Sequence, residues 1–250
     1  MGGLRQRRAI RSVRTTSEAL IVRAGTMNVV LFGATGMVGA GTLLECFADP
    51  RVTSVLAVTR SATGRSHPKL HEVLHADFFD YDTLRDRFAT CDACFFCLGA
   101  SSIGMSEAAY IRVTYDLTLA AARALVAANP QMTFCFVSGV GTDSTERGRT
   151  MWARVKGKTE NALLALGFNA AFMFRPGYIQ PIGDVESKTG WVQTAYDIAR
   201  PLYPLIHRLL PNNSTTTSNL GRAMIHVAAA GYWKPVLYSA DFNTLAAMRP

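Results

Sequence analysis

One segment carries the clearest structural signal: Val29-Val30-Leu31-Phe32-Gly33-Ala34-Thr35-Gly36-Met37-Val38-Gly39. Its apolar run predicts a buried strand, which passes through a glycine-rich loop into a helix. Glycine is needed where such a turn is tight, where backbone approaches a pyrophosphate, and where helix and strand touch. The free N–H groups and positive dipole end of a helix N-terminus favour phosphate. The loop therefore predicts a dinucleotide site formed by Gly33, Thr35, Gly36, Met37, Val38 and Gly39.

Outward from this loop, short β-rich runs alternate with longer helical ones. We expect strands over residues 29–32, 52–59, 73–76, 93–98, 132–137 and 170–174, and helices through Leu43 to Phe47 and over 82–88, 108–128, 151–166 and 218–230. Strands that are apolar on both faces and alternate with helices predict an α/β fold, a doubly wound parallel Rossmann sheet with helices on both faces. We expect one domain over 27–250, with a small C-terminal substrate lobe from about residue 176.

The positive charge is concentrated in residues 1–26. The chain has a formal net charge of +8, but this segment holds six arginines and one glutamate and so contributes +5. The remaining +3 is ordinary for a soluble domain, and we expect no nucleic-acid partner. No apolar run reaches the ~18–20 residues of a membrane span. Residues 1–26 are interpreted as a disordered basic extension or as a targeting peptide, with the cytoplasm as the expected location.

The end of the second strand indicates which dinucleotide is bound. Arg60 lies 21 residues after Gly39. Proteins that bind an unphosphorylated adenosine ribose typically have a carboxylate at about this position. A guanidinium pairs with a 2′-phosphate, so we expect NADP(H) to be preferred, with NAD(H) as the alternative. Asp77, just past the third strand, is placed to contact the adenine. A solvent-facing role for Arg60 stays open.

Several segments together resemble the atypical short-chain dehydrogenase/reductases, which are NAD-dependent epimerase/dehydratase-like, and most closely the Tat-interacting oxidoreductase-like proteins. They are Gly33–Gly39, Cys97-Leu98-Gly99, Ile111-Arg112-Val113, Ser138 and Val155-Lys156-Gly157. The resemblance implies a Rossmann fold, NADP(H) binding and carbonyl or alcohol redox chemistry. It further implies that Leu98, Gly99 and Ala100 border the cofactor and that Pro176 and Tyr178 lie beside the nicotinamide.

The catalytic residues of this class are only partly present. Such reductases resemble one another in a Tyr-x-x-x-Lys pair, whose members share a helix face, and a serine after the preceding strand. Here Ser138 and Lys156 occupy the serine and lysine positions, but Trp152 stands at the tyrosine position. An indole has no proton to give near neutral pH, and general acid catalysis contributes ~10²–10⁴-fold. Tyr178 or an acid of the substrate is the alternative proton donor.

Two groupings that suggest a metal are discounted. Cys91, Cys94 and Cys97 are spaced like cluster ligands, but Cys94 and Cys97 point to opposite faces of a strand. His67, His71 and His75 recur every fourth residue, but Pro68 and the β-like run argue against a helix. We therefore expect no metal site.

Three functions remain open. The chain binds NADP(H) with weak or no reductase activity, or it is an active NADP-dependent oxidoreductase on an unknown small carbonyl or alcohol, or it is an NADPH-responsive interaction protein. A small-molecule substrate, a homodimer and a protein partner are all compatible with the sequence. The apolar, Pro-interrupted segment 198–210 is expected to form a pocket lid or a subunit contact.

Overall fold

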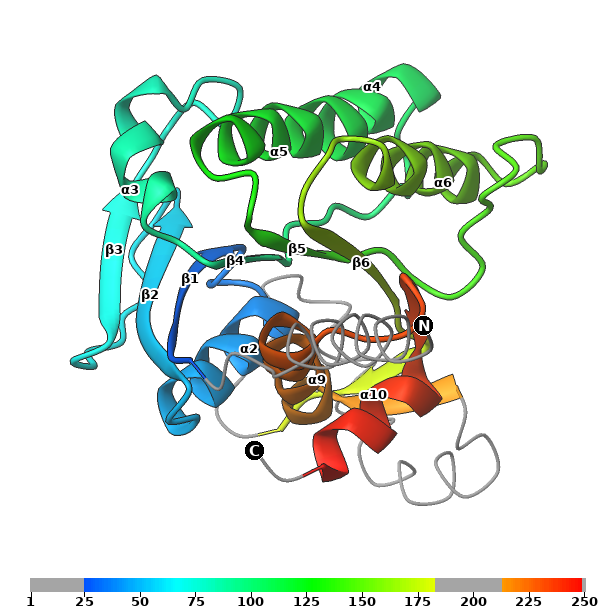
Figure 1. Cartoon of the computed structure of the whole chain (residues 1–250). Helices are drawn as coiled ribbons and strands as arrows, with labels where there is room; N and C mark the ends of the chain where they lie inside the picture. The colour runs from blue at the N-terminus through cyan, green and yellow to red at the C-terminus, as the bar shows by residue number, and fades with distance from the viewer. Residues whose placement is uncertain (1–24, 183–212, 249–250) are drawn as a thin grey trace, which may run out of the picture.

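The computed structural model describes residues 25–182 and 213–248. Seven parallel strands form one sheet in the order β3-β2-β1-β4-β5-β6-β9, with α2, α9 and α10 on one face and α3 to α6 on the other (Figure 1). The prediction of a doubly wound parallel Rossmann sheet is confirmed. Segments 1–24 and 198–210, for which an extension and a lid were expected, lie outside the described residues.

The strands of the main sheet are β1 (Met27–Phe32), β2 (Val52–Thr59), β3 (Leu70–Leu74), β4 (Ala93–Phe96), β5 (Thr133–Val137), β6 (Ala170–Arg175) and β9 (Val236–Tyr238). A second, two-stranded sheet pairs β7 (Tyr178–Gln180) with β8 (Ser214–Thr216). The helices are α2 (Met37–Ala48), α3 (Arg85–Ala89), α4 (Glu107–Ile111), α5 (Leu117–Ala128), α6 (Met151–Leu164), α9 (Thr217–Ala230) and α10 (Ser239–Ala247). A 3₁₀ turn, Asp82–Leu84, precedes α3, and a π-helical turn, Arg112–Asp116, joins α4 to α5.

Three features differ from the sequence expectation. The third strand begins at Leu70 and not at residue 73, because it is a half-exposed edge strand whose apolar signal is weak. The helix expected over 108–128 is divided by the π-helical turn. After residue 176, α9 packs on α2, and β9 pairs with β6. These elements therefore extend the main sheet and its helical layer, and among the described strands β7 and β8 pair apart from it.

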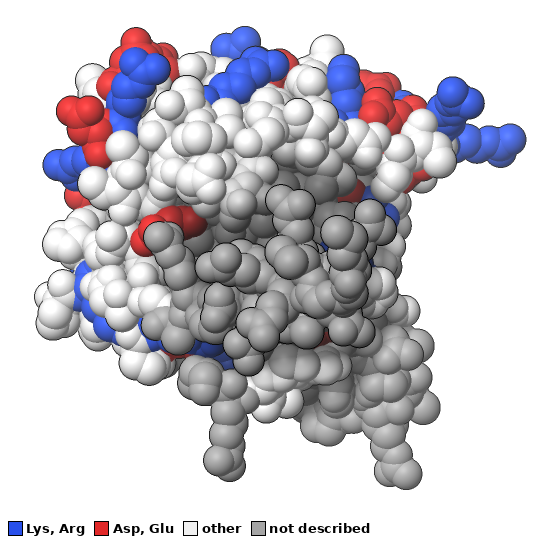
Figure 2. Space-filling view, viewed as in Figure 1, with Lys and Arg blue, Asp and Glu red and all other residues white. Residues whose placement is uncertain are grey.

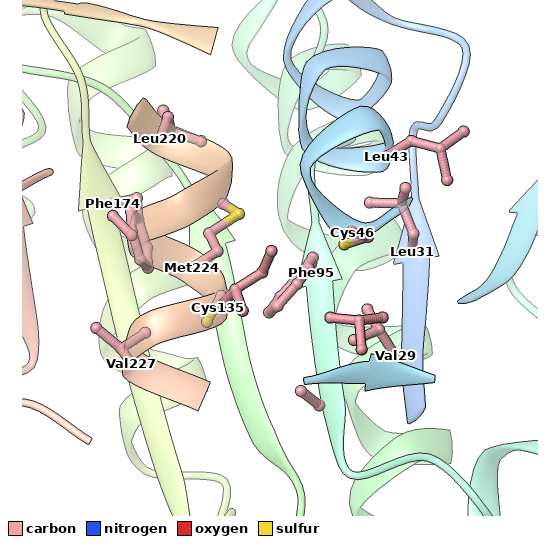
Figure 3. Close-up of a cluster of buried hydrophobic side chains, with 14 of the residues drawn as sticks. Val29, Leu31, Leu43, Cys46, Phe95, Cys135, Phe174, Leu220, Met224 and Val227 are labelled. Carbon is pink, nitrogen blue, oxygen red and sulfur yellow. The ribbon is translucent and has the colours of Figure 1, made fainter. Parts of the chain in front are cut away.

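The core lies on both faces of the sheet. On the face covered by α2 and α9, strand residues such as Leu31 and Phe95 meet Leu43 and Cys46 of α2 and Met224 of α9 (Figure 3). These side chains are fully buried. Because the strands are covered on both sides, their ends and the loops that follow them form the exposed edge at which a ligand can be bound.

Helices α2 and α9 approach each other closely through small residues. A Cβ at Gly41 would lie 2.5 Å from the Cβ of Thr217, and a Cβ at Gly221 would lie 3.0 Å from the Cα of Thr42. At the rim of the same contact, the Glu45 carboxylate accepts hydrogen bonds from Ser218 Oγ at 2.6 Å and Arg222 Nε at 2.8 Å. The contact fixes α2, and with it the loop between β1 and α2, against the C-terminal part of the chain.

The substitution Gly41→Ala tests this packing. Helix propensity alone favours alanine by ~1 kcal/mol, but the added methyl group overlaps Thr217. We expect the free energy of unfolding to fall by ~1–3 kcal/mol in denaturant titration. A gain in stability would contradict the close approach of the two helices.

Candidate functional site

Two adjacent cavities lie at the C-terminal ends of the strands. One, of about 530 Å³, is lined by Arg60, Asp77 and Phe79 and by the π-helical turn residue Val113. The other, of about 480 Å³, lies between the N-terminus of α2 and the ends of β5 and β6. Both are lined by Leu98 and Gly99, directly after β4. The cleft therefore spans the point between β1 and β4 where the strand order reverses, which is the usual ligand position in such sheets.

The glycine loop shapes the middle of this cleft. Gly33 has φ +81°, and a Cβ there would lie 2.8 Å from the Cys97 carbonyl group. A Cβ at Gly39 would lie 2.1 Å from the Gly33 oxygen, so both glycines are required by the protein's own backbone. Gly36 is different, because its nearest neighbour would be 3.5 Å away and the residue lines the second cavity. The space beside Gly36 is available to a ligand.

The loop also presents the start of α2. Gly36 is the N-cap residue, and no side chain of the described chain caps the first turn. Met37 and Val38 line the cavity together with Gly36. Uncapped N–H groups at a helix N-terminus favour an anion. Gly33, Thr35 and Gly39 line neither cavity and act through the shape of the loop.

The first cavity has a cation at its mouth. Arg60 is exposed directly after β2, and Ala76 to Phe79 follow β3. The Asp77 Oδ1 atom accepts a hydrogen bond from the Phe79 N–H at 2.9 Å, which orders this turn. The Arg112 guanidinium lies 4.9 Å from the centre of the Phe79 ring. Ala100 completes the lining after β4.

Arg112 is a second cation beside the first cavity that the sequence analysis did not assign. Its contact with Phe79 places it next to the cavity wall, and the π-helical turn that it begins also supplies Val113 to the lining. π-Helical turns are rare in proteins overall, but those that occur are often found at functional sites. The sequence carried no signal for this turn, because the Ala-rich pattern of 108–128 is that of an uninterrupted helix.

At the second cavity, Ser138, Lys156 and Pro176 come together. All three line it, and the Lys156 ammonium group donates a hydrogen bond to the Ser138 backbone carbonyl. The Ser138 hydroxyl is directed elsewhere, because it donates to Glu160 Oε1 at 2.5 Å. The serine expected to hold a substrate oxygen therefore makes its strongest hydrogen bond to a buried carboxylate.

Neither Trp152, at the tyrosine position, nor Tyr178, the alternative proton donor, lines this cavity. The six-membered ring of Trp152 packs against Gly141, which has φ +87°. A Cβ at Gly141 would lie 3.3 Å from the Trp152 ring. The Tyr178 hydroxyl donates to Gln180 Oε1 at 2.9 Å, on the strand that pairs with β8. Among the described residues, no tyrosine lines either cavity.

Cys97 also lines the second cavity, but it is not suited to nucleophilic chemistry. Burial raises the pKa of the Cys97 thiol to about 12. The thiol therefore stays protonated at neutral pH, whereas the thiolate is the reactive form. Its neighbour on the strand, Cys94, belongs to the core on the opposite face of the sheet.

The histidines have local roles. The His67 ring stacks on Phe47 with 4.1 Å between ring centres, and His75 Nε2 lies 2.7 Å from the Asp80 carbonyl oxygen. In residues 25–182 and 213–248, no group of three or more His, Cys, Asp or Glu side chains is arranged to hold a metal ion. All five cysteines are free thiols.

Lys156 is the titratable group best placed to act in the second cavity. Desolvation lowers the pKa of its ammonium group from 10.5 to about 8, and the nearby Glu160 carboxylate opposes part of this shift. A large fraction of the lysine therefore changes protonation state slightly above neutral pH. An amine in this state can hold a cofactor hydroxyl or exchange a proton with a ligand.

The surface over α4 to α6 carries both positive and negative side chains. Figure 2 shows Lys and Arg interspersed with Asp and Glu along the upper edge of the molecule, over α4 to α6 as placed in Figure 1. One exposed ion pair there joins Arg154 to Glu107 at 2.8 Å. Within the described parts of the chain, no helix has the length and apolarity needed to span a membrane.

The fold and cleft are those of a Rossmann protein of the short-chain dehydrogenase/reductase type. Residues 29–149 match the model of the NAD dependent epimerase/dehydratase family. The prediction of an epimerase/dehydratase-like short-chain dehydrogenase/reductase is confirmed. The closer likeness to Tat-interacting oxidoreductase-like proteins stays a prediction.

Named relatives and solved structures agree with this assignment. The mitochondrial protein fmp52 of Emericella nidulans is 28% identical over 162 residues, which cover 61% of this chain and 66% of that protein. The mitochondrial protein fmp52-2 of Neosartorya fischeri is 25% identical over 226 residues, covering 86% and 94%. The Bordetella bronchiseptica enzyme WbmF in complex with NAD+ aligns with a TM-score of 0.59 at 15% identity, over 88% of this chain and 77% of that one.

The relatives correct one expectation. The cytoplasm was the expected location, but these curated relatives are named as mitochondrial proteins, and the expectation is therefore wrong. The acid-poor, arginine-rich composition of residues 1–26 agrees with the alternative of a targeting peptide.

Replacing Lys156 with methionine tests its protonation state. Because the pKa of the lysine is lower in the folded protein than in the unfolded chain, the charged amine destabilises the fold below pH 8. The cost is relieved as pH rises from about 8 towards 10.5. We expect Lys156→Met to raise the free energy of unfolding at pH 7 by ~1–3 kcal/mol, with a difference that shrinks above pH 8.

Chemical denaturation across pH 6–10 measures this difference. Lys158→Met is the matched control, because Lys158 is exposed on the same helix and lies over the Tyr115 ring at 4.7 Å. A pH-independent effect of Lys156→Met would show that the ammonium group is not destabilised by burial.

Proposed function

We propose that this chain binds NADP(H) in the two-part cleft and reduces carbonyl substrates weakly or not at all. The observation that carries the proposal is the pair of cavities that meet at Leu98 and Gly99, with the uncapped N-terminus of α2 between them. This arrangement fits a molecule with an anionic centre and an aromatic group at each end. The family description and the NAD+ bound to WbmF support a nicotinamide dinucleotide.

The residues present fit each part of such a cofactor. The missing Cβ of Gly36 leaves room for a pyrophosphate beside the N–H groups of Met37 and Val38. Asp77 and Phe79 line the cavity proposed for the adenosine, and Lys156 and Pro176 line the one proposed for the nicotinamide riboside. When bound, NADPH would supply a hydride. The chain itself contributes orientation of the cofactor.

The preference for NADP(H) rests on charge at the adenosine end. Arg60 lines that cavity, and the Arg112 guanidinium lies over Phe79 in its wall. Among the described residues of this lining, Asp77 is the one carboxylate, and it follows β3 and not β2, after which a ribose-binding carboxylate is expected. A guanidinium at the end of β2 favours a 2′-phosphate.

The expectation of weak turnover follows from the lack of a suitable proton donor among the described residues. A carbonyl that accepts a hydride also needs a proton on its oxygen, and reductases of this type use a tyrosine for it. Trp152 takes that position and packs against Gly141. The Tyr178 hydroxyl is engaged by Gln180, which weighs against the alternative in which Tyr178 substitutes. The alternative of an NADPH-responsive interaction protein depends on residues 183–212, which lie outside the described chain.

The change Arg60→Ala tests cofactor choice. We expect NADPH affinity to fall by about 10–100-fold, because the charge-assisted pair between the guanidinium and the 2′-phosphate is lost. NADH has no 2′-phosphate, so its affinity should stay unchanged. Fluorescence titration of both cofactors measures this, with Arg85→Ala as the control because Arg85 is exposed on α3 and lines neither cavity. Tighter NADH than NADPH binding by the unmodified chain would refute the preference. No binding of either would refute the function.

The change Trp152→Tyr tests the missing proton donor. Residues 152 and 156 are one helical turn apart, so a phenol at 152 shares a face with Lys156. We expect steady-state NADPH oxidation with a panel of aldehydes and ketones to be slow for the unmodified chain and ~10²-fold faster for Trp152→Tyr. Trp152→Phe should match the unmodified chain. Turnover of the unmodified chain at ordinary reductase rates, ~1–10³ s⁻¹, would overturn the proposal.

A further inference from the structure

We propose that the buried Glu160–Arg175 ion pair is a positioning device for Lys156: it fixes the Ser138 carbonyl that receives the ammonium group, and its carboxylate helps to keep that group charged. The inference deepens the proposed function and rests on it, because Lys156 lines the cavity proposed for the nicotinamide riboside. Glu160 and Arg175 touch neither cavity and therefore act through Ser138 and Lys156.

The pair is more deeply buried than the other ion pairs of the described chain. The Glu160 side chain is 1% exposed and that of Arg175 is 9% exposed. Arg175 Nε lies 3.1 Å and 3.2 Å from the two carboxylate oxygens, and Arg175 Nη2 also donates to Oε2. Arg175 further donates to the Tyr238 hydroxyl at 3.2 Å and to Ser144 Oγ. The pair thus joins α6 to β6, to β9 and to the loop after β5.

Ser138 connects this pair to the lysine. Its N–H donates to the Phe174 carbonyl at 2.8 Å, its hydroxyl donates to Glu160 Oε1 at 2.5 Å, and its carbonyl accepts from Lys156 Nζ. The residue is therefore held from β6, from α6 and from the cavity side. A shift of the carboxylate would move the serine, and with it the acceptor that fixes the ammonium group.

The Glu160–Arg175 pair has a second effect, on the charge of Lys156. Glu160 lies one turn along α6 and raises the pKa of the ammonium group, whereas desolvation lowers it. Arg175 on β6 faces the same carboxylate and balances its charge. Cys97, across the cavity after β4, is a protonated thiol, and the N-terminus of α2 presents the positive end of its dipole. Among the described residues, Glu160 is thus the negative charge that acts on this lysine.

Stability alone is a weak reason for such a pair. A buried ion pair costs so much desolvation that apolar residues of the same volume are often as stabilising or more so. Chains that retain one beside a ligand site gain a fixed geometry from it, as outer-shell partners do for metal ligands. Here the geometry that is fixed is that of Ser138 and Lys156.

The test uses the full chain without cofactor. Acetylation of Lys156 by acetic anhydride is followed against pH by peptide mass spectrometry, because only the neutral amine reacts. Glu160→Gln keeps the shape of the side chain and removes its charge. We expect the midpoint of Lys156 acetylation to fall by about 1 pH unit in this variant, since the charged amine loses its nearest anion while Arg175 remains.

Ser138→Ala separates position from charge. It removes the hydroxyl bridge and leaves the ion pair, so we expect the acetylation midpoint to stay in place while NADPH affinity falls on the order of tenfold. Asp49→Asn is the control, because the Asp49 carboxylate also binds an arginine, Arg51 at 2.7 Å, but lies in the turn between α2 and β2 and lines neither cavity. It should change neither quantity.

Each result decides the proposal. An unmoved acetylation midpoint in folded Glu160→Gln overturns the charge effect, and unaltered NADPH affinity in Ser138→Ala overturns the positioning effect. If Glu160→Gln does not fold, the Ser138→Ala result decides, because it leaves the buried charges paired. If the unmodified chain binds no NADPH, the proposed function fails, and the acetylation midpoint of Glu160→Gln still tests the pair.

Discussion

The nucleotide cleft depends on one close contact between backbone segments. The Gly33 carbonyl oxygen sits where a side chain at Gly39 would begin, and it accepts a hydrogen bond from the Gly36 N–H at 2.9 Å. Gly33 itself lies against the Cys97 carbonyl group at the end of β4. These contacts bring the start of α2 to the ends of β1 and β4. Without them the helix N-terminus would not face the cleft.

A second close contact places the other end of the cleft. A Cβ at Gly157 would lie 1.8 Å from the Asp143 carbonyl oxygen, so α6 presses its backbone against the loop after β5. The Asp143 carboxylate accepts hydrogen bonds from the Thr145 hydroxyl and from the N–H groups of Gly148, Thr145 and Arg147, and those hydrogen bonds lower its pKa. The glycine beside Lys156 thus lets the helix approach a loop that is ordered by its own aspartate. Both ends of the cleft follow from backbone contacts that only glycine permits.

The sequence predicted the parts of this structure that local chemistry controls. The second strand was placed over residues 52–59, where it is found, because its residues are apolar on both faces. The third strand was misplaced, since an edge strand with exposed His71 and Glu72 has no such pattern. The three-residue β9 and the partners of Ser138 depend on contacts between residues far apart in the chain. Glu160 and Arg175 are 15 residues apart, and no periodicity indicates that they meet.

Different residues of the cleft would bind the cofactor and transfer a proton, so cofactor binding can persist when turnover is lost. The groups that fit the adenosine and the pyrophosphate come from the first half of the chain, after β1, β2, β3 and β4. The groups that would handle a substrate proton come from the second half, where Trp152 replaces a phenol and Ser138 is turned to Glu160. A change at position 152 leaves the glycine loop and Arg60 untouched. A tryptophan at the tyrosine position therefore does not by itself remove the groups that line the rest of the cleft.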